Sequence, residues 1–260
     1  MPSSIKFKKI DSFAFISIDR PASKNSLLPN DVIECTRLIT EASANPSVRV
    51  IVLGADGDFC SGVDIGVFES IGPGRRWPQI GDFILEVFEP LVEAISNSSK
   101  PTVALLDGIV AGAGMSIALN CDYRIATKRT KIVPAFSKLG LIPDCGGTWL
   151  LPRLLGIANA MEFITTASPT GAEKAKELGL VTWLVDSIDH VDVQGRLKAI
   201  SALSTNSTTQ LRRLLCQNWS RSLSDSLAAE REAMSMLGSG ADFQEGLLAF
   251  HQRRLPAFEG

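Results

Sequence analysis

Residues 101–120 of the chain read PTVALLDGIVAGAGMSIALN. The apolar run within residues 101–107 predicts a strand buried on both faces. The small residues of 108–114 follow as a loop, and the apolar stretch 115–120 predicts a helix. Such a loop offers backbone N–H groups at the positive end of a helix dipole, which suits an anion or an oxyanion. The same residues would also let a helix pack closely on a strand, and this loop alone does not decide between the two roles.

Strands and helices are expected to alternate on both sides of this segment. β-branched and apolar runs predict strands, and apolar residues at helical spacing predict helices. We expect strands at 5–10, 13–19, 48–53, 123–126, 131–133 and 181–185, and helices at 30–44, 79–96 and from 146 onward. This order predicts an α/β fold with layered β-β-α groupings in residues 1–186 and a helical, more charged region in residues 187–260.

Composition excludes several classes of function. A chain of 260 residues, 45% hydrophobic, can bury a core without disulfides or a structural metal. Its formal net charge of −2 argues against nucleic acid as a partner. No apolar run reaches the roughly 18 residues of a membrane span, so no membrane partner is expected. Five scattered cysteines without a C-x-x-C pair predict reduced thiols in the cytoplasm and no metal site.

Two further glycine-rich segments accompany the first. Residues 58–65 read DFCSGVDI and follow the strand expected at 48–53, and residues 140–149 read GLIPDCGGTW. A dinucleotide-binding fingerprint is disfavoured because Ile117 stands at its third glycine position, and no G-x-x-x-x-G-K-[ST] phosphate loop occurs.

Taken together, the three segments closely resemble the crotonase (enoyl-CoA hydratase/isomerase) superfamily. Residues 59–64 look like its F-x-x-G-x-D loop, and residues 112–122 look like its G-G-G-x-E-L-A-x-x-C-D helix start. The resemblance extends from residues 16–21 to residues 249–260. It implies an α/β, crotonase-like spiral of β-β-α units with a C-terminal helical trimerisation region. It also implies a homotrimer or hexamer, an acyl-CoA substrate and no permanently bound cofactor, since coenzyme A is part of the substrate.

The resemblance also implies where a substrate is held. The backbone N–H groups of Ser61 and Ala113 match the oxyanion hole, which stabilises charge that appears only in a thioester enolate. Lys24 and the loop after Ser61 match positions around the coenzyme. Arg254, with Arg253, is a candidate for its phosphates, with a neighbouring subunit as the possible donor of the pair. The loop residues concerned are Gly62, Val63, Asp64 and Ile65. Asp64 has the alternative of anchoring its own loop, and Arg254 that of a solvated surface residue.

Departures from the family pattern reduce the number of reactions that the chain is expected to catalyse. Hydratases of this family hold and split water between two glutamates, and the matching positions here carry Ser116 and Phe136. Neither side chain can act as a general base at neutral pH, so two-carboxylate hydration is disfavoured. We expect both residues to contact the acyl group instead, with local capping as the alternative role of Ser116.

Asp144 remains as the acid expected near the acyl group. It matches the catalytic aspartate of several isomerases, and residues 136–152 look most like the branch that includes the phenylacetate-pathway ring-opening isomerase. One carboxylate suffices for a 1,3-proton shift, and apolar neighbours such as Phe136 would raise its pKa. Its alternative role is to cap the helix that follows. Cys145 is not expected to be a nucleophile, because neither histidine is close in sequence.

The resemblance and these departures from it together imply an isomerase that converts 3-enoyl-CoA to 2-enoyl-CoA. Ring opening or decarboxylation of another acyl thioester, and a catalytically silent acyl-CoA-binding protein, stay open as alternatives. Whether coenzyme A or a carrier protein bears the acyl group also stays open. Residues 71–77 (IGPGRRW) are a candidate lid with Trp77 as an aromatic wall, or an ordinary surface connection.

Overall fold

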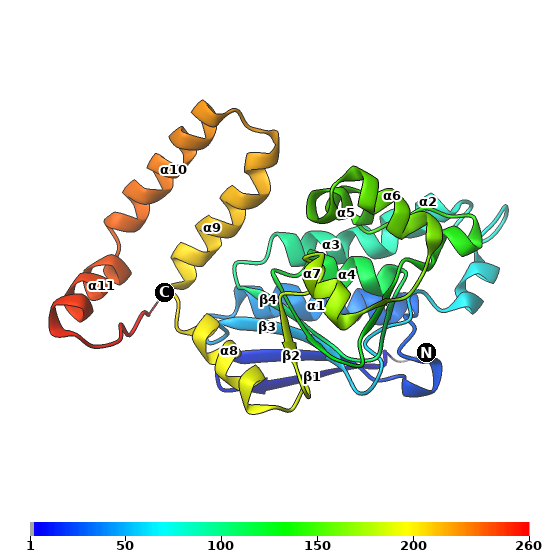
Figure 1. Cartoon of the computed structure of the whole chain (residues 1–260), viewed down its shortest axis with the longest axis horizontal. Helices are drawn as coiled ribbons and strands as arrows, with labels where there is room; N and C mark the ends of the chain where they lie inside the picture. The colour runs from blue at the N-terminus through cyan, green and yellow to red at the C-terminus, as the bar shows by residue number, and fades with distance from the viewer. Residues whose placement is uncertain (1–2, 260) are drawn as a thin grey trace.

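The computed structural model describes residues 3–259, which are built around a six-stranded sheet (Figure 1). The strand order is β1 (Ile5–Ile10), β2 (Phe13–Ile18), β3 (Val50–Ala55), β4 (Thr102–Leu106), β6 (Tyr123–Thr127) and β9 (Trp183–Val185). β1 pairs antiparallel with β2, and every later neighbour pair is parallel. Helices cover both faces of the sheet, which explains why the central strands are continuously apolar.

A smaller sheet lies beside the large one and turns the chain into a spiral. It contains β5 (Ile109–Ala111), β7 (Lys131–Val133) and β8 (Thr170–Gly171). In one turn of the spiral, β4 is followed by β5 and then by helix α4 (Ala113–Asn120). The predicted spiral of β-β-α units is confirmed. The sequence prediction missed β5, because its three residues belong to the small-residue stretch that we assigned to a loop.

The helices of the first half follow the predicted ranges closely. α1 (Pro29–Ala44) matches the expected helix at 30–44. The expected helix at 79–96 consists of α2 (Ile80–Phe83), a π-helical turn (Ile84–Phe88) and α3 (Glu89–Ser96). α5 (Gly147–Leu155), α6 (Ile157–Thr166) and α7 (Ala172–Glu177) come later in the chain.

The candidate lid at residues 71–77 is a short closed loop. Ile71 and Trp77 form a β-bridge, and the Trp77 side chain is only 3% exposed. Its ring lies 4.8 Å from that of Phe83, and its indole N–H donates to Glu86 at 2.9 Å. Trp77 is therefore part of the hydrophobic core, and it does not form the exposed aromatic wall of a lid.

The C-terminal region is helical from α8 (Val191–Ser201) onward. α8 packs on the sheet, whereas α9 (Thr205–Gln217), α10 (Leu223–Gly238) and α11 (Ala241–Gln252) extend away from it. We call α9–α11 the arm (Figure 1). No helix within residues 3–259 is long and apolar enough to cross a membrane.

The arm is joined to the body along α9. In the second half of this helix, the Arg212 guanidinium binds the Asp122 carboxylate at 2.7 Å and the Ile95 carbonyl oxygen at 3.0 Å. At its tip, the Arg153 guanidinium of α5 lies 4.0 Å from the ring centre of Trp149 and 5.4 Å from that of Trp219. Beyond these contacts, the arm exposes a series of large apolar side chains. They include Leu211, Leu215, Leu223, Leu227, Met234, Phe243, Leu247 and Phe250.

Candidate active site

The loop at residues 59–64 lies directly against the start of α4. Cys60 pairs with Val110 of β5, and backbone hydrogen bonds of 3.1 Å and 2.8 Å join Cys60 to Ile109 and Ala111. Gly62 has a φ of +103°, and a Cβ atom there would lie 3.2 Å from the Ala111 oxygen and 3.5 Å from the Ala113 nitrogen. Glycine is thus what allows the two backbones to approach, as the close packing of the glycine-rich segments suggests.

Two backbone N–H groups, where the loop at residues 59–64 meets the start of α4, donate no hydrogen bond within the described part of the chain. Among residues 3–259, neither the Val63 amide nor the Ala113 amide donates a hydrogen bond to the protein. Ala113 is the first residue of α4, where an N–H has no partner within the helix. The Leu27 N–H bonds to the Gly62 oxygen and the Asp64 N–H to the Leu27 oxygen. In such a parallel bridge the intervening Val63 N–H points to the opposite side, away from Leu27.

The structure corrects the prediction for Ser61. Its backbone N–H donates to the Lys24 carbonyl oxygen at 3.0 Å, so this amide is already engaged in holding the loop. Val63, which we expected only as a substrate contact, carries the free amide next to Ala113. No local pattern predicts this difference, because the acceptor for the Ser61 N–H belongs to another loop.

The segment that carries Asp144 is held against the other end of the same helix. The Asn120 side chain of α4 donates to the carbonyl oxygens of Ser116 and Cys145, at 2.8 Å each. Cys145 and Gly146 have φ values of +51° and +79°, so the chain reverses here before α5 begins. A Cβ atom at Gly147 would lie 2.9 Å from the Ser116 hydroxyl oxygen. Ser116 and the segment around Asp144 are therefore in close contact.

The Asp144 side chain is half-buried, and its Oδ1 atom is buried without a hydrogen-bond partner in the described part of the chain. Burial raises the pKa of this carboxyl, although hydrogen bonds from the Cys145 thiol and the Asp144 backbone partly oppose the shift. The first residue before α5 is Gly146, and no side chain caps this helix end. The alternative role of Asp144 as a helix cap is therefore contradicted.

Ser116 and Phe136 are both buried near this segment. Ser116 is fully buried on α4, and its hydroxyl oxygen has no hydrogen-bond partner within residues 3–259. Phe136 is 7% exposed in the short 3-10 helix Ala135–Leu139, and its carbonyl oxygen accepts from the Leu141 N–H at 3.0 Å. Neither residue supplies a second carboxyl group beside Asp144.

The residues expected to contact the coenzyme differ in their exposure and in their hydrogen bonds. Lys24 is exposed, and its ammonium makes no ion pair among the described residues. Ile65, in the loop after Ser61, is 73% exposed. The Asp64 carboxylate accepts from Arg20 at 3.0 Å, from Ser26 at 3.0 Å and from Gly66 at 3.1 Å. Burial alone would raise the pKa of Asp64, but these hydrogen bonds hold it below its usual value, so Asp64 anchors its own loop.

Arg254 does not reach this site within one chain. It follows α11, at the end of the arm that lies away from α4 (Figure 1). Its guanidinium forms a two-point ion pair with Glu245, at 2.5 Å and 2.8 Å. Arg254 therefore does not serve the coenzyme of its own subunit, and a role on the phosphates of a neighbouring subunit's coenzyme stays a prediction.

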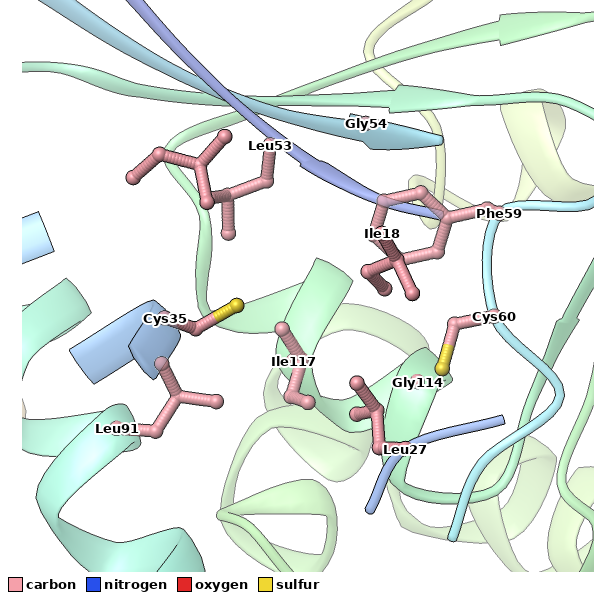
Figure 2. A pocket seen from close by; sticks show the side chains of 11 residues that line it. Ile18, Leu27, Cys35, Leu53, Gly54, Phe59, Cys60, Leu91, Gly114 and Ile117 are labelled. Atoms are coloured by element: carbon pink, nitrogen blue, oxygen red, sulfur yellow. The ribbon is translucent and has the colours of Figure 1, made fainter. Parts of the chain in front are cut away.

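A small cavity lies behind the glycine-rich loops (Figure 2). Its volume is about 20 Å³, and apolar groups and the thiols of Cys35 and Cys60 line it. Burial raises the pKa of both thiols, that of Cys60 to about 12. The cavity is too small for an acyl group and lies within the core, so we do not assign it to the substrate.

Comparison with known proteins identifies the family. The family model for enoyl-CoA hydratase/isomerase matches residues 8–260. The chain belongs to this family. It is 32% identical over 247 residues to 1,2-epoxyphenylacetyl-CoA isomerase of Escherichia coli K12, an alignment that covers 94% of each chain. It is 30% identical over 254 residues to the mitochondrial methylglutaconyl-CoA hydratase of Rattus norvegicus, covering 94% of this chain and 78% of that one.

Solved structures of the family share the whole fold. The crystal structure of an enoyl-CoA hydratase from Polaromonas sp. JS666 matches with a TM-score of 0.90 at 28% identity, covering 98% of this chain and 99% of that one. An enoyl-CoA hydratase from Bacillus anthracis matches with a TM-score of 0.90 at 25% identity, covering 99% and 100%. The protein is thus an enzyme of the crotonase type with the crotonase fold. Its relatives include both hydratases and an isomerase, so the reaction has to be argued from its own residues.

Proposed function

We propose that the protein is an acyl-CoA isomerase that shifts a double bond from 3-enoyl-CoA to 2-enoyl-CoA, with Asp144 as the proton carrier. The observation that carries this proposal is the Asp144 carboxyl, whose buried Oδ1 has no hydrogen-bond partner in the described chain. A carboxylate in this state is a stronger base than one in water, because burial raises its pKa.

The proposed oxyanion hole consists of the Val63 and Ala113 amides. Their N–H groups are unoccupied and belong to two segments that Gly62 allows to approach closely. A thioester carbonyl oxygen bound between them becomes an enolate oxygen once a proton leaves C2. Donors fixed in advance stabilise that charge without reorganising, and loss of one such donor from an enzyme costs about 3 kcal/mol.

One carboxyl group can then complete the reaction. Asp144 takes a proton from C2 of a 3-enoyl thioester, and the resulting dienolate spreads its charge to C4. Asp144 then delivers a proton to C4, so that the double bond moves to C2–C3 and no water is consumed. The carboxyl proton exchanges with solvent while the dienolate is bound, so deuterium from D₂O enters the product. Ser116 and Phe136 occupy the two positions at which the hydratases carry glutamate, so a water molecule would lack its pair of carboxylates.

Exposed residues support a contact with the coenzyme and an oligomeric state. We place Lys24 near the coenzyme, because it is a solvent-exposed cation next to the Ser61 loop. Coenzyme A enters as part of the substrate, and no permanently bound cofactor is proposed. The exposed apolar residues of the arm support a homotrimer or hexamer, because an apolar surface of this kind is typical of a protein interface. The cytoplasmic location stays a prediction from the cysteines.

Ring opening of another acyl thioester is the second candidate. It is favoured by the similarity to 1,2-epoxyphenylacetyl-CoA isomerase, and it would use the same enolate and the same carboxyl group. Decarboxylation and silent acyl-CoA binding remain further alternatives. Silent binding predicts affinity for coenzyme A thioesters without any proton exchange.

Deuterium exchange at C2 of an acyl thioester tests the proposal. The purified protein is incubated in D₂O with 3-hexenoyl-CoA and separately with saturated hexanoyl-CoA. We expect deuterium at C2 or C4 and conversion to 2-hexenoyl-CoA, without formation of 3-hydroxyhexanoyl-CoA. Hydration of 2-hexenoyl-CoA at a comparable rate would overturn the isomerase assignment, and binding without exchange would favour the silent protein.

A further inference from the structure

Lys100 is a buried lysine whose charge has no partner. It is 8% exposed and stands two residues before β4 begins. Its ammonium makes no hydrogen bond and no ion pair within residues 3–259, whereas its backbone N–H and carbonyl oxygen both pair with the Ser98 hydroxyl, at 3.0 Å and 2.9 Å. Lysine is almost never fully buried unless it is paired, because a charge out of water is costly. The positive charge of Lys100 is therefore uncompensated in the described chain.

A second cation, Arg49, lies beside Lys100. β3 and β4 pair in parallel, with Ile51 opposite Thr102. The same register, continued two residues back along both strands, places Arg49 opposite Lys100. Opposite residues of such a pair project to the same face of the sheet. Burial and, after it, the Arg49 guanidinium lower the pKa of Lys100, as expected where two cations are close together.

Arg49 connects the sheet to the start of the arm and keeps its full charge. Its guanidinium donates to the carbonyl oxygens of Ser201, at the end of α8, and of Leu203, in the turn before α9, at 2.6 Å each. A third bond, of 3.3 Å, reaches the Phe258 carbonyl oxygen. These acceptors are neutral, so they do not compensate the charge. A guanidinium has five N–H donors, so these three bonds leave two for a ligand.

The carboxylate beside the start of β4 is already in use. Asp122 accepts from the Thr102 N–H at 2.7 Å and pairs with the Arg212 guanidinium at 2.7 Å. It does not pair with Lys100, and no other carboxylate within residues 3–259 forms an ion pair with Lys100 or Arg49. The negative charge that would compensate these two cations therefore has to come from outside the described chain.

We propose that Lys100 and Arg49 form a binding site for a small oxyanion of the size and charge of inorganic phosphate. Two adjacent cations, both partly removed from water, suit a doubly charged anion. The guanidinium can contact two of its oxygens through a planar fork, and the ammonium supplies a compact charge for a third. The Lys100 Nζ atom is not among the unpaired atoms that are fully enclosed, so a small ion can reach it from the solvent.

The site lies at the opposite end of β4 from the candidate active site. Lys100 precedes β4, whereas the loop at residues 59–64 meets β5 and α4, which follow β4. The bound anion takes no part in the proposed isomerisation, so the inference does not rest on it. Because Arg49 also holds the Ser201 and Leu203 carbonyl oxygens, an anion between Arg49 and Lys100 should stabilise the attachment of the arm to the sheet.

Isothermal titration calorimetry of the whole chain with inorganic phosphate tests the inference. At constant ionic strength, set with sodium chloride, wild type should bind one phosphate per chain. Lys100→Met keeps an unbranched side chain without its charge and should bind phosphate at least about tenfold more weakly, as loss of a hydrogen bond to a charged group does. Lys128 is exposed and pairs with Asp186 at 2.8 Å, so Lys128→Met should bind phosphate as wild type does.

Thermal unfolding supplies a second readout. In phosphate-free buffer, Lys100→Met should unfold at a higher temperature than wild type, because it removes a buried charge that has no partner. Lys128→Met should not, because it loses an ion pair. Added phosphate should raise the unfolding midpoint of wild type more than sodium chloride of equal ionic strength does, since it binds the folded state. It should also slow hydrogen–deuterium exchange in residues 201–205, and Lys100→Met should show neither effect.

Three results would overturn the inference. Equal phosphate affinity of wild type and Lys100→Met would place the anion elsewhere on the protein. A lower unfolding midpoint of Lys100→Met in phosphate-free buffer would mean that the lysine charge is compensated without an anion. Equal shifts of the wild-type midpoint by phosphate and by chloride would show ionic screening only. This last comparison uses wild type alone, so it decides the matter even if Lys100→Met folds poorly.

Discussion

The Asn120 side chain donates a hydrogen bond to the carbonyl oxygen of Cys145 at 2.8 Å. This bond connects the last residue of α4 to the residue that follows the proposed base. Cys145 has a φ of +51°, a left-handed conformation that costs a non-glycine residue about 1–2 kcal/mol. The backbone on which Asp144 stands is therefore held in place by a side chain from another element.

Replacing Asn120 by alanine should impair catalysis more than stability. Without the bond, the segment around Cys145 can relax and move the Asp144 carboxyl, and misplacement of a reacting group by about 1 Å costs up to about a hundredfold in rate. We expect kcat for 3-hexenoyl-CoA to fall roughly tenfold to a hundredfold. The Asn159 side chain makes a similar bond, to the Leu155 oxygen at 2.9 Å, away from the site. Asn159→Ala should lose about as much stability with unchanged kcat, and an equal fall in kcat would contradict the prediction.

Asp144→Asn should abolish most of the activity and stabilise the fold at neutral pH. General acid–base catalysis contributes about 10²–10⁴-fold, so kcat should fall by that order. The pKa of Asp144 is raised in the folded state by burial. The Asp144 carboxyl therefore contributes its full stabilisation at pH values below its pKa in the unfolded protein. This stabilisation is lost as the pH rises through its higher pKa in the folded protein. The variant should gain stability over wild type as pH rises through this range.

The same raised pKa sets the pH profile of the wild-type enzyme. The base must be ionised to take the C2 proton, so kcat/KM should increase as pH rises through the raised pKa of Asp144 and then level off. Rates measured by conversion of 3-hexenoyl-CoA between pH 4 and 8 test this. A profile that stays flat down to pH 4, or an Asp144→Asn variant with near-normal activity, would show that another group carries the proton.

The sequence predicted the architecture because the signals for it are local. Apolar runs marked the buried strands, and the glycine-rich segments marked the loops that meet at α4. The engaged amide of Ser61 was not predictable, because its acceptor is the Lys24 carbonyl in another loop. The position of Trp77 depends on its contacts with Phe83 and Glu86, which no local pattern reveals. The Arg254 pair with Glu245 depends in the same way on how the chain folds back after α11.

Gly62→Ala should remove activity by disturbing the proposed oxyanion hole. The added methyl group would lie 3.5 Å from the Ala113 nitrogen and 3.2 Å from the Ala111 oxygen, so the loop must move away from α4. We expect kcat to fall by about 10²-fold, as for loss of one oxyanion donor.

Gly57→Ala is the matched control for this variant. Gly57 also has a positive φ, +74°, but a Cβ atom there meets nothing within 4 Å. Both variants should lose about 1–2 kcal/mol of unfolding free energy because of the backbone strain. Only Gly62→Ala should lose activity in the deuterium-exchange assay. Equal activity of the two variants would argue against an oxyanion hole at Val63 and Ala113.

The arm should mediate association of the protein with copies of itself. Leu223 and Phe250 are 77% and 80% exposed on α10 and α11, and burial of one such side chain contributes about 1.5–3 kcal/mol. We expect wild type to sediment as a trimer or hexamer, and Leu223→Lys with Phe250→Asp to shift the protein toward monomers. Val191 on α8 is 73% exposed, and Val191→Lys should leave the sedimentation coefficient unchanged. A monomeric wild type would reject the proposed oligomer.

Arg212 should be the residue that holds α9, and with it the arm, on the body of the protein. Its side chain is 10% exposed and pairs with Asp122, whose other carboxylate oxygen accepts from the Thr102 N–H at 2.7 Å and the Thr102 hydroxyl at 2.9 Å. Arg212 also donates to the carbonyl oxygens of Ile95 and Ser98. Its removal leaves the partly buried Asp122 carboxylate with its Thr102 hydrogen bonds but without its ion-pair partner, and it removes the donor to the Ser98 carbonyl oxygen, which costs about 3 kcal/mol.

Chemical denaturation of Arg212→Ala, Arg212→Lys and Arg213→Ala tests this role. Arg213 is the exposed neighbour of Arg212, so its loss should change the unfolding free energy by less than about 0.5 kcal/mol. Lysine at 212 keeps the charge but cannot reach several acceptors at once, so its cost should be intermediate. Arg212→Ala should also weaken self-association, because α9 carries the rest of the arm. If Arg212→Ala unfolds at the same denaturant concentration as Arg213→Ala, the arm must be held by its apolar contacts instead.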